Sequence, residues 1–131
     1  MACGLMEMAE HPDAMRRLYE FVEEDIRRCM LWMEAEGLLT LNNGNHYAGA
    51  GSYGFTRELP RPGSQGRVRL RDLWLNLNSQ ETVGISPAMF EDLAYPTYQR
   101  LSELGGLVYY GCCEPVHDIW GTCISQLHHL R

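Results

Sequence analysis

The sequence has few basic residues and no long apolar run, and these two absences exclude several classes of function. Eleven Lys or Arg stand against seventeen Asp or Glu, so the 131 residues carry a net charge of −6 with a pI near 5.3. Nucleic acids and anionic membranes bind concentrated basic faces, and the densest basic run, Arg67 to Arg71, is short. No stretch approaches the roughly 20 apolar residues of a membrane-spanning helix. We therefore expect no nucleic-acid partner and no membrane.

The chain also lacks a disulfide framework and a signal peptide. Its five cysteines are odd in number and irregularly spaced, with Cys112 and Cys113 adjacent, which is not the pattern of a secreted disulfide scaffold. Residues 1–10 contain no basic segment followed by an apolar core, so they do not resemble a secretory signal. A reduced, cytoplasmic location is the expectation.

Apolar spacing predicts helices that alternate with short strands. A helix is expected over residues 11–36, because Pro12 suits a first turn and Gly37 a C-terminal end. Eight residues at helical spacing form its apolar face, for which core packing is favoured over a cofactor or partner surface: Met15, Leu18, Tyr19, Val22, Ile26, Cys29, Met30 and Met33. Buried strands are expected at 38–41, 73–77 and 107–110, and further helices from Ser86 to the Gly105-Gly106 pair, kinked at Pro96, and over 115–130.

Strands that alternate with helices and are apolar on both faces indicate an α/β fold with a parallel sheet. We expect a single unit over residues 1–131, with about three parallel strands and covering helices. The glycine-rich and asparagine-rich stretch from Asn42 to Gly54 is predicted to be a loop that allows unusual dihedrals or a close backbone approach.

Polar side chains follow each of the three expected strands. In parallel α/β folds, functional residues gather at the C-terminal strand ends, so these groups are expected to share a cleft. Gln80 could orient a polar substrate and Glu81 could act as an acid or base, although a solvated loop carboxylate is an equally good reading. Asn42 and Asn43 could donate amide hydrogen bonds to a ligand, or could be ordinary turn residues.

The richest group follows the third expected strand: Cys112, Cys113, Glu114, His117 and Asp118. Thiolates and imidazoles are good zinc ligands, and a thiolate at a helix N-terminus becomes more nucleophilic. However, the chain has no C-x-x-C or H-x-x-x-H pair. A buried cysteine beside acidic residues that favour a helix start is the alternative.

Three segments resemble proteins of the uroporphyrinogen decarboxylase superfamily. Residues 79–90, SQETVGISPAMF, are similar to its S-Q-E-x-x-G-x-S-P-x-M-F segment, and residues 109–118, YYGCCEPVHD, to its Y-G-C-C-E-P-x-H-D segment. The glycine-rich stretch from Asn42 through Tyr53 to Pro60 resembles a third segment. Together they cover most of the chain from the first helix onward, in the family's order.

The resemblance implies a (β/α)8 TIM barrel and one of two activities. One is methyl transfer to or from a corrinoid carried by a partner protein, with zinc activating a thiol; the other is cofactor-free decarboxylation of uroporphyrinogen. The subgroup with Y-G-C-C-E-P resembles the methyltransferase branch more closely. Cys112 matches the cysteine of that branch's H-x-C zinc motif, but Tyr110 stands at the histidine position, so Glu114 or His117 would have to substitute.

The implied site has three parts. Glu81, Glu114 and His117 are the expected catalytic residues, Cys112 and Cys113 the expected metal ligands, and the substrate-binding set is Asn42, Asn43, Tyr53, Gln80 and Asp118. Because such a barrel needs about 250 residues, we expect the chain to be a partial barrel, an internal fragment or truncation, that self-associates or is completed by the missing segments. A catalytically inactive remnant is the third alternative.

Overall fold

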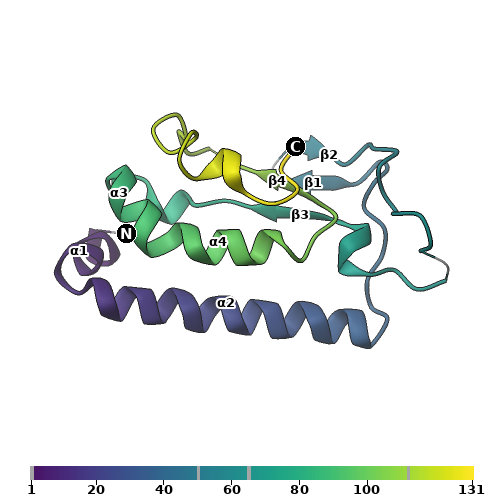
Figure 1. Cartoon of the computed structure of the whole chain (residues 1–131), viewed down its shortest axis with the longest axis horizontal. Helices are drawn as coiled ribbons and strands as arrows, with labels where there is room; N and C mark the ends of the chain where they lie inside the picture. The colour runs from purple at the N-terminus through teal and green to yellow at the C-terminus, as the bar shows by residue number, and fades with distance from the viewer. Residues whose placement is uncertain (1, 50, 65, 112) are drawn as a thin grey trace.

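The computed structural model describes residues 2–49, 51–64, 66–111 and 113–131 and shows a layered arrangement (Figure 1). Helix α1 (Ala2–Glu10) leads into the long helix α2 (Pro12–Ala35). Helix α4 (Tyr95–Ser102) runs between α2 and a pair of strands. Pro12 is in the first turn of α2, and Gly37 follows its end with a φ of 69°, a conformation that glycine adopts without strain. The predicted helix over residues 11–36 is confirmed.

The strand pair consists of β3 (Trp74–Leu77) and β4 (Leu107–Tyr110), which run parallel. Trp74 pairs with Leu107 and Leu77 with Tyr110, so both strands end at the same level. The connection between them contains α3 (Pro87–Met89), the π-helical η3 (Phe90–Ala94) and α4. The strands predicted at 73–77 and 107–110 are confirmed.

The single kinked helix predicted around Pro96 is instead divided into α3, the π-helical turn η3, which ends two residues before Pro96, and α4. Proline has no N–H to donate, and its ring collides with the carbonyl four residues earlier, so a wider turn relieves the conflict. Ser86 caps the start of this connection as expected, because its Oγ accepts a hydrogen bond of 3.2 Å from the Met89 N–H.

A short antiparallel hairpin replaces the loop expected from Asn42 to Gly54. Strand β1 (Tyr47–Gly49) pairs with β2 (Ser52–Tyr53). At Gly49 any Cβ would collide with the ring of Tyr109 in β4. The expected close backbone approach is therefore found here, between the hairpin and the parallel pair.

The predicted partial (β/α)8 TIM barrel with about three parallel strands is wrong. Within the described residues there are two sheets of two strands each, and one of these is antiparallel. Residues 38–41 form no strand, and the Leu38 side chain is 54% exposed. Beside β3, the Asn42 side chain takes the place of a strand: it accepts from the Trp74 N–H at 2.9 Å and donates to the Trp74 carbonyl at 3.0 Å.

The helix predicted over residues 115–130 is also wrong. This segment consists of turns and the short 3-10 helix η4 (Ile124–Gln126). Three of its apolar residues are nevertheless buried: Cys123, Ile124 and Leu127 join Phe90, Ala94 and Tyr98 in the main core cluster, whereas Trp120 is 50% exposed. The chain then passes along β4, where the Val108 N–H donates to the His129 carbonyl at 2.8 Å and Leu130 forms a parallel bridge with Val108.

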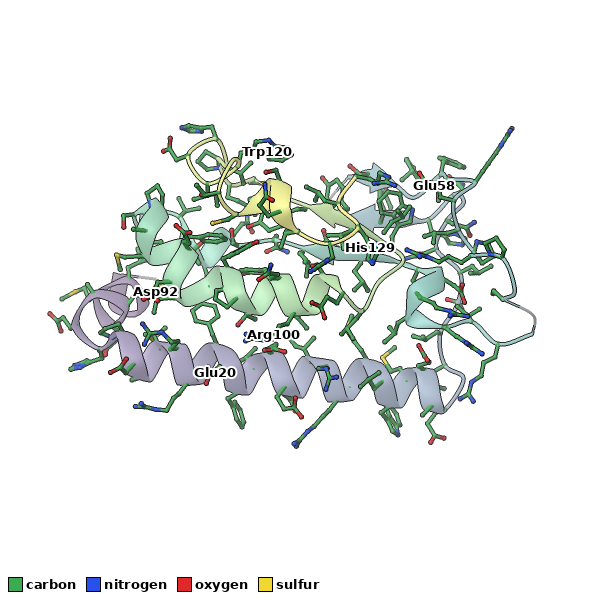
Figure 2. All side chains as sticks on the ribbon, viewed as in Figure 1. Glu20, Glu58, Asp92, Arg100, Trp120 and His129 are labelled. Atoms are coloured by element: carbon green, nitrogen blue, oxygen red, sulfur yellow. The ribbon has the colours of Figure 1, made fainter. Side chains whose placement is uncertain are left out.

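Helix α2 packs on the rest of the molecule through only part of its apolar surface. Its buried Glu23 forms an ion pair of 2.6 Å with Arg100, which lies between α4 and α2 in Figure 2. Phe21 and Trp32 are 72% and 57% exposed. Of the eight residues expected in the core, four are exposed and four are partly buried; the exposed ones are Leu18, Val22, Ile26 and Cys29. None of the described helices combines the length and apolar character needed to cross a membrane.

Candidate functional site

The candidate site lies at the C-terminal ends of β3 and β4. Because the two strands are paired in register, the segments that follow them leave the sheet side by side. The 3-10 helix η2 (Gln80–Thr82) follows β3, and Gly111 follows β4. The Gly111 N–H extends the pairing by donating to the Leu77 carbonyl at 2.9 Å, and its φ of 126° suits glycine alone.

Ser79 joins the two segments through a hydrogen-bond network. Its backbone N–H donates to Oε1 of Glu114 at 2.9 Å, and its hydroxyl shares a short hydrogen bond with the hydroxyl of Tyr110. Its carbonyl accepts from the Thr82 hydroxyl at 2.7 Å. Ser79 is 1% exposed, so these bonds form away from water, where leaving a polar group unpaired is costly.

Glu81 is the centre of a second group that includes three phenols. The Tyr98 hydroxyl donates to its Oε1 at 2.8 Å. Burial, together with the charge of Glu81, raises the pKa of Tyr19 to about 12. Burial and the hydrogen bond to Glu81 also raise the pKa of Tyr98. Burial also raises the pKa of Tyr110 to about 12, against the opposing effect of its bond to Ser79. All three tyrosines therefore keep their protons at neutral pH.

Two adjacent hollows open at these strand ends. One, of about 490 Å³, is lined by residues from both segments: Gln80, Glu81, Val83, Cys113, Glu114 and Pro115. The other, of about 230 Å³, is lined by Glu114, His117 and Asp118 together with residues of η2 and α3. Of the predicted site residues, Gln80 and Glu81 thus line the larger hollow and His117 and Asp118 the smaller one, while Glu114 lines both.

His117 and Asp118 lie at the outer rim of the smaller hollow. The His117 Nε2 is 3.5 Å from Oδ1 of Asp118, and both side chains are about three-quarters exposed. An exposed imidazole beside a carboxylate can exchange protons with solvent. The catalytic role of His117 and the substrate-binding role of Asp118 stay predictions.

The other three predicted substrate-binding residues lie elsewhere. Asn42 binds the backbone of Trp74, the first residue of β3, and the Asn43 amide donates to the Leu59 carbonyl at 2.5 Å. Tyr53 is exposed on β2, where its ring stacks on Tyr47 with 5.0 Å between centroids. Substrate binding by these residues stays a prediction, and the structure does not place them in the two hollows at the strand ends.

Of the two predicted zinc ligands, the structure describes one. Cys112 lies outside the described residues, whereas Cys113 is exposed and lines the larger hollow beside Glu114. Among the residues that the structure describes, no three His, Cys, Asp or Glu side chains gather closely enough to hold a metal ion. Zinc binding stays a prediction.

Sequence reasoning misses the tyrosines and the serine that support the two carboxylates. For Tyr98 the sequence contains one indication of this role: a tyrosine on a buried helical face usually needs a hydrogen-bond partner for its hydroxyl. Tyr110 and Ser79 stand within the two motifs, but nothing in the motifs indicates that their hydroxyls meet. Their pairing depends on the parallel register of β3 and β4, which no local pattern contains.

Comparisons with protein families, with curated proteins and with solved structures give no match to this chain.

Proposed function

We propose that the chain forms part of the substrate-binding wall of a uroporphyrinogen-decarboxylase-like enzyme that transfers methyl groups to or from a corrinoid carried by a partner protein. The observation that carries this proposal is the meeting of two separate motifs in one hollow. Gln80 and Glu81 come from the S-Q-E motif and Cys113 and Glu114 from the Y-G-C-C-E-P motif, and the Ser79–Glu114 hydrogen bond joins the two.

The charges around the hollows favour this activity over tetrapyrrole decarboxylation. The chain contains no lysine, and none of the described residues that line either hollow is an arginine. A porphyrinogen with many carboxylates would require cationic partners, whereas Glu81 and Glu114 would repel it. A neutral or cationic methyl donor or acceptor fits these walls better.

Glu81 and Glu114 are the proposed proton acceptors. When a methyl group passes from a corrinoid to a thiol, the thiol loses its proton and the cobalt keeps the electron pair of the broken bond. A carboxylate within hydrogen-bond reach can take up that proton. Gln80 and Asp118 would orient the acceptor and His117 would pass the proton to solvent. We propose that Cys112 and Cys113 would hold zinc, which would activate the thiol. We also propose that the protein is cytoplasmic.

A titration with methylcobalamin, followed by its visible absorbance, tests the proposal. We expect Glu114→Gln to weaken binding about tenfold, which corresponds to the loss of one charge-assisted hydrogen bond. Glu20→Gln is the matched control, because Glu20 is exposed on α2 (Figure 2). Equal binding by the wild type and Glu114→Gln would contradict the assignment of the site.

Two further measurements on the wild-type chain distinguish methyl transfer from decarboxylation and from a structural role. Release of carbon dioxide from uroporphyrinogen without a metal would favour the decarboxylase. A folded chain that binds neither compound would favour a structural role, in which self-association or another segment covers its apolar surfaces.

A further inference from the structure

A second pair of hollows lies on the other side of Glu81, against helix α2. One, of about 450 Å³, is lined mainly by apolar residues of α1 and α2: Gly4, Met8, Met15, Leu18, Tyr19, Val22 and Glu81. The next, of about 290 Å³, lies between α2, β3 and α4 and includes Tyr98 and Leu101. Tyr19, Val22 and Glu81 line both, so the two hollows meet at these residues.

Glu81 is the only charged residue among the described residues that line these two hollows. Within the described part of the chain no arginine or histidine forms an ion pair with it, and the sequence contains no lysine. Its hydrogen-bond partner is the neutral Tyr98 hydroxyl, at 2.8 Å. These two adjoining hollows form a groove between α2, η2, β3 and α4 whose walls are mostly apolar, with the polar side chains of Asn76, Asn78 and Thr97 among them. Its one carboxylate, Glu81, is exposed and forms no ion pair with a described side chain.

From this geometry we infer that the groove between α2 and η2 binds a small alkylammonium cation, with its charged nitrogen at Glu81 and its alkyl groups against the methionines and Tyr19. A carboxylate supplies the opposite charge, and aromatic rings attract organic cations more strongly than they attract neutral alkyl groups. A strongly hydrated ion such as sodium gains nothing from the apolar part of these walls, because it keeps its water shell.

The binding itself does not depend on a corrinoid. Only the further identification of this cation as the methyl-bearing substrate rests on the proposed function, because Glu81 also lines the hollow at the strand ends. The two ideas can therefore fail separately.

Calorimetric titration with choline, and with its uncharged isostere in which carbon replaces the nitrogen, tests the inference. We expect choline to bind about tenfold more tightly than the isostere. In Glu81→Gln, whose amide can still accept the Tyr98 hydrogen bond, the two compounds should bind equally. Glu20→Gln removes a charge outside the groove and should leave the preference unchanged.

Two results would overturn the inference: equal affinity of the wild type for both compounds, or an unchanged preference for choline in Glu81→Gln. Amide spectra of each variant establish that it is folded before titration. A protein that prefers choline but ignores methylcobalamin would refute the proposed function alone, and the reverse result would refute the cation site alone.

Discussion

At each end of strand β3 a polar side chain from another segment binds the backbone, but the two side chains differ in what else they contact. At the N-terminal end, both polar atoms of the Asn42 amide bind the backbone of Trp74. At the C-terminal end, Glu114 binds the Ser79 N–H and also lines two hollows. Asn42 therefore completes a sheet edge, whereas Glu114 is held in place with part of its surface open to a ligand. Substitutions at the Asn42 end should therefore change stability, whereas Glu114→Gln should change ligand binding.

The largest stability effect is expected at the N-terminal end of β3. Asn42→Ala removes two hydrogen bonds to a partly buried backbone and should lower the free energy of unfolding by about 1–3 kcal/mol. Urea denaturation measures this loss, and the folded fraction should bind methylcobalamin with unchanged affinity. Asn45→Ala, at an exposed neighbour, is the control and should change stability by less than about 0.5 kcal/mol. Equal losses in both variants would mean that the Asn42 pairing is not stabilising.

At the C-terminal end, Ser79 and Tyr110 should behave as a coupled pair. Ser79→Ala and Tyr110→Phe each remove one side of the same buried hydrogen bond, so each should cost about 1 kcal/mol of unfolding free energy. The double variant should cost little more than either single variant, because the second change removes nothing further. Simple additivity in this double-mutant cycle would show that the two hydroxyls do not interact.

The tyrosines of the site predict a loss of stability at high pH. An unfolded tyrosine loses its proton near pH 10, but Tyr19 and Tyr110 keep theirs in the folded state until about pH 12. Between these values the folded state binds more protons than the unfolded state, so the free energy of unfolding falls as the pH rises. Denaturation midpoints measured from pH 9 to 12 should decrease, and Tyr110→Phe should make the decrease shallower. A flat profile would contradict the burial of these phenols.

The exposed side of α2 should affect association more than stability. Phe21 and Trp32 lie largely in solvent, so Phe21→Gln with Trp32→Gln should change the free energy of unfolding by less than about 0.5 kcal/mol. Sedimentation at increasing protein concentration should show that the wild type self-associates more than the variant, because exposed apolar surface favours contact between copies. A wild type that stays monomeric at every concentration would contradict this.

Local patterns in the sequence are sufficient for the elements that local chemistry determines. The Pro12 and Gly37 boundaries of α2, the Ser86 cap and the two apolar strands β3 and β4 all follow from nearest-neighbour effects. The predictions of a strand at 38–41 and a helix at 115–130 are wrong for opposite reasons. The apolar residues 38–41 join neither of the two sheets that the structure describes. Cys123, Ile124 and Leu127 reach the core through turns and a 3-10 helix, which apolar spacing does not distinguish from an α-helix.

The carboxylates of the candidate site are predictable from the rule that functional residues follow parallel strands. That rule alone assigns Glu81 and Glu114 to one cleft. It also places Asn42 in that cleft, whereas in the structure the Asn42 amide binds the backbone of Trp74 at the other end of β3, because residues 38–41 form no strand of the sheet; substrate binding by Asn42 stays a prediction. The partners of the carboxylates, Tyr98 and Ser79, are not predictable in this way, because their contacts come from the tertiary packing of α4 and from strand register.

The amide resonance of Ser79 tests most directly whether the two motifs form one site. The Ser79 N–H donates to Oε1 of Glu114, and a charged acceptor makes a stronger hydrogen bond than a neutral one. Glu114→Gln should therefore shift the Ser79 amide resonance while leaving the amides of α2 unchanged. We expect the Ser79 amide to be among the most strongly shifted outside residues 113–115. An unshifted Ser79 amide in the folded variant would show that the two motifs do not meet, and the proposed site would have to be abandoned.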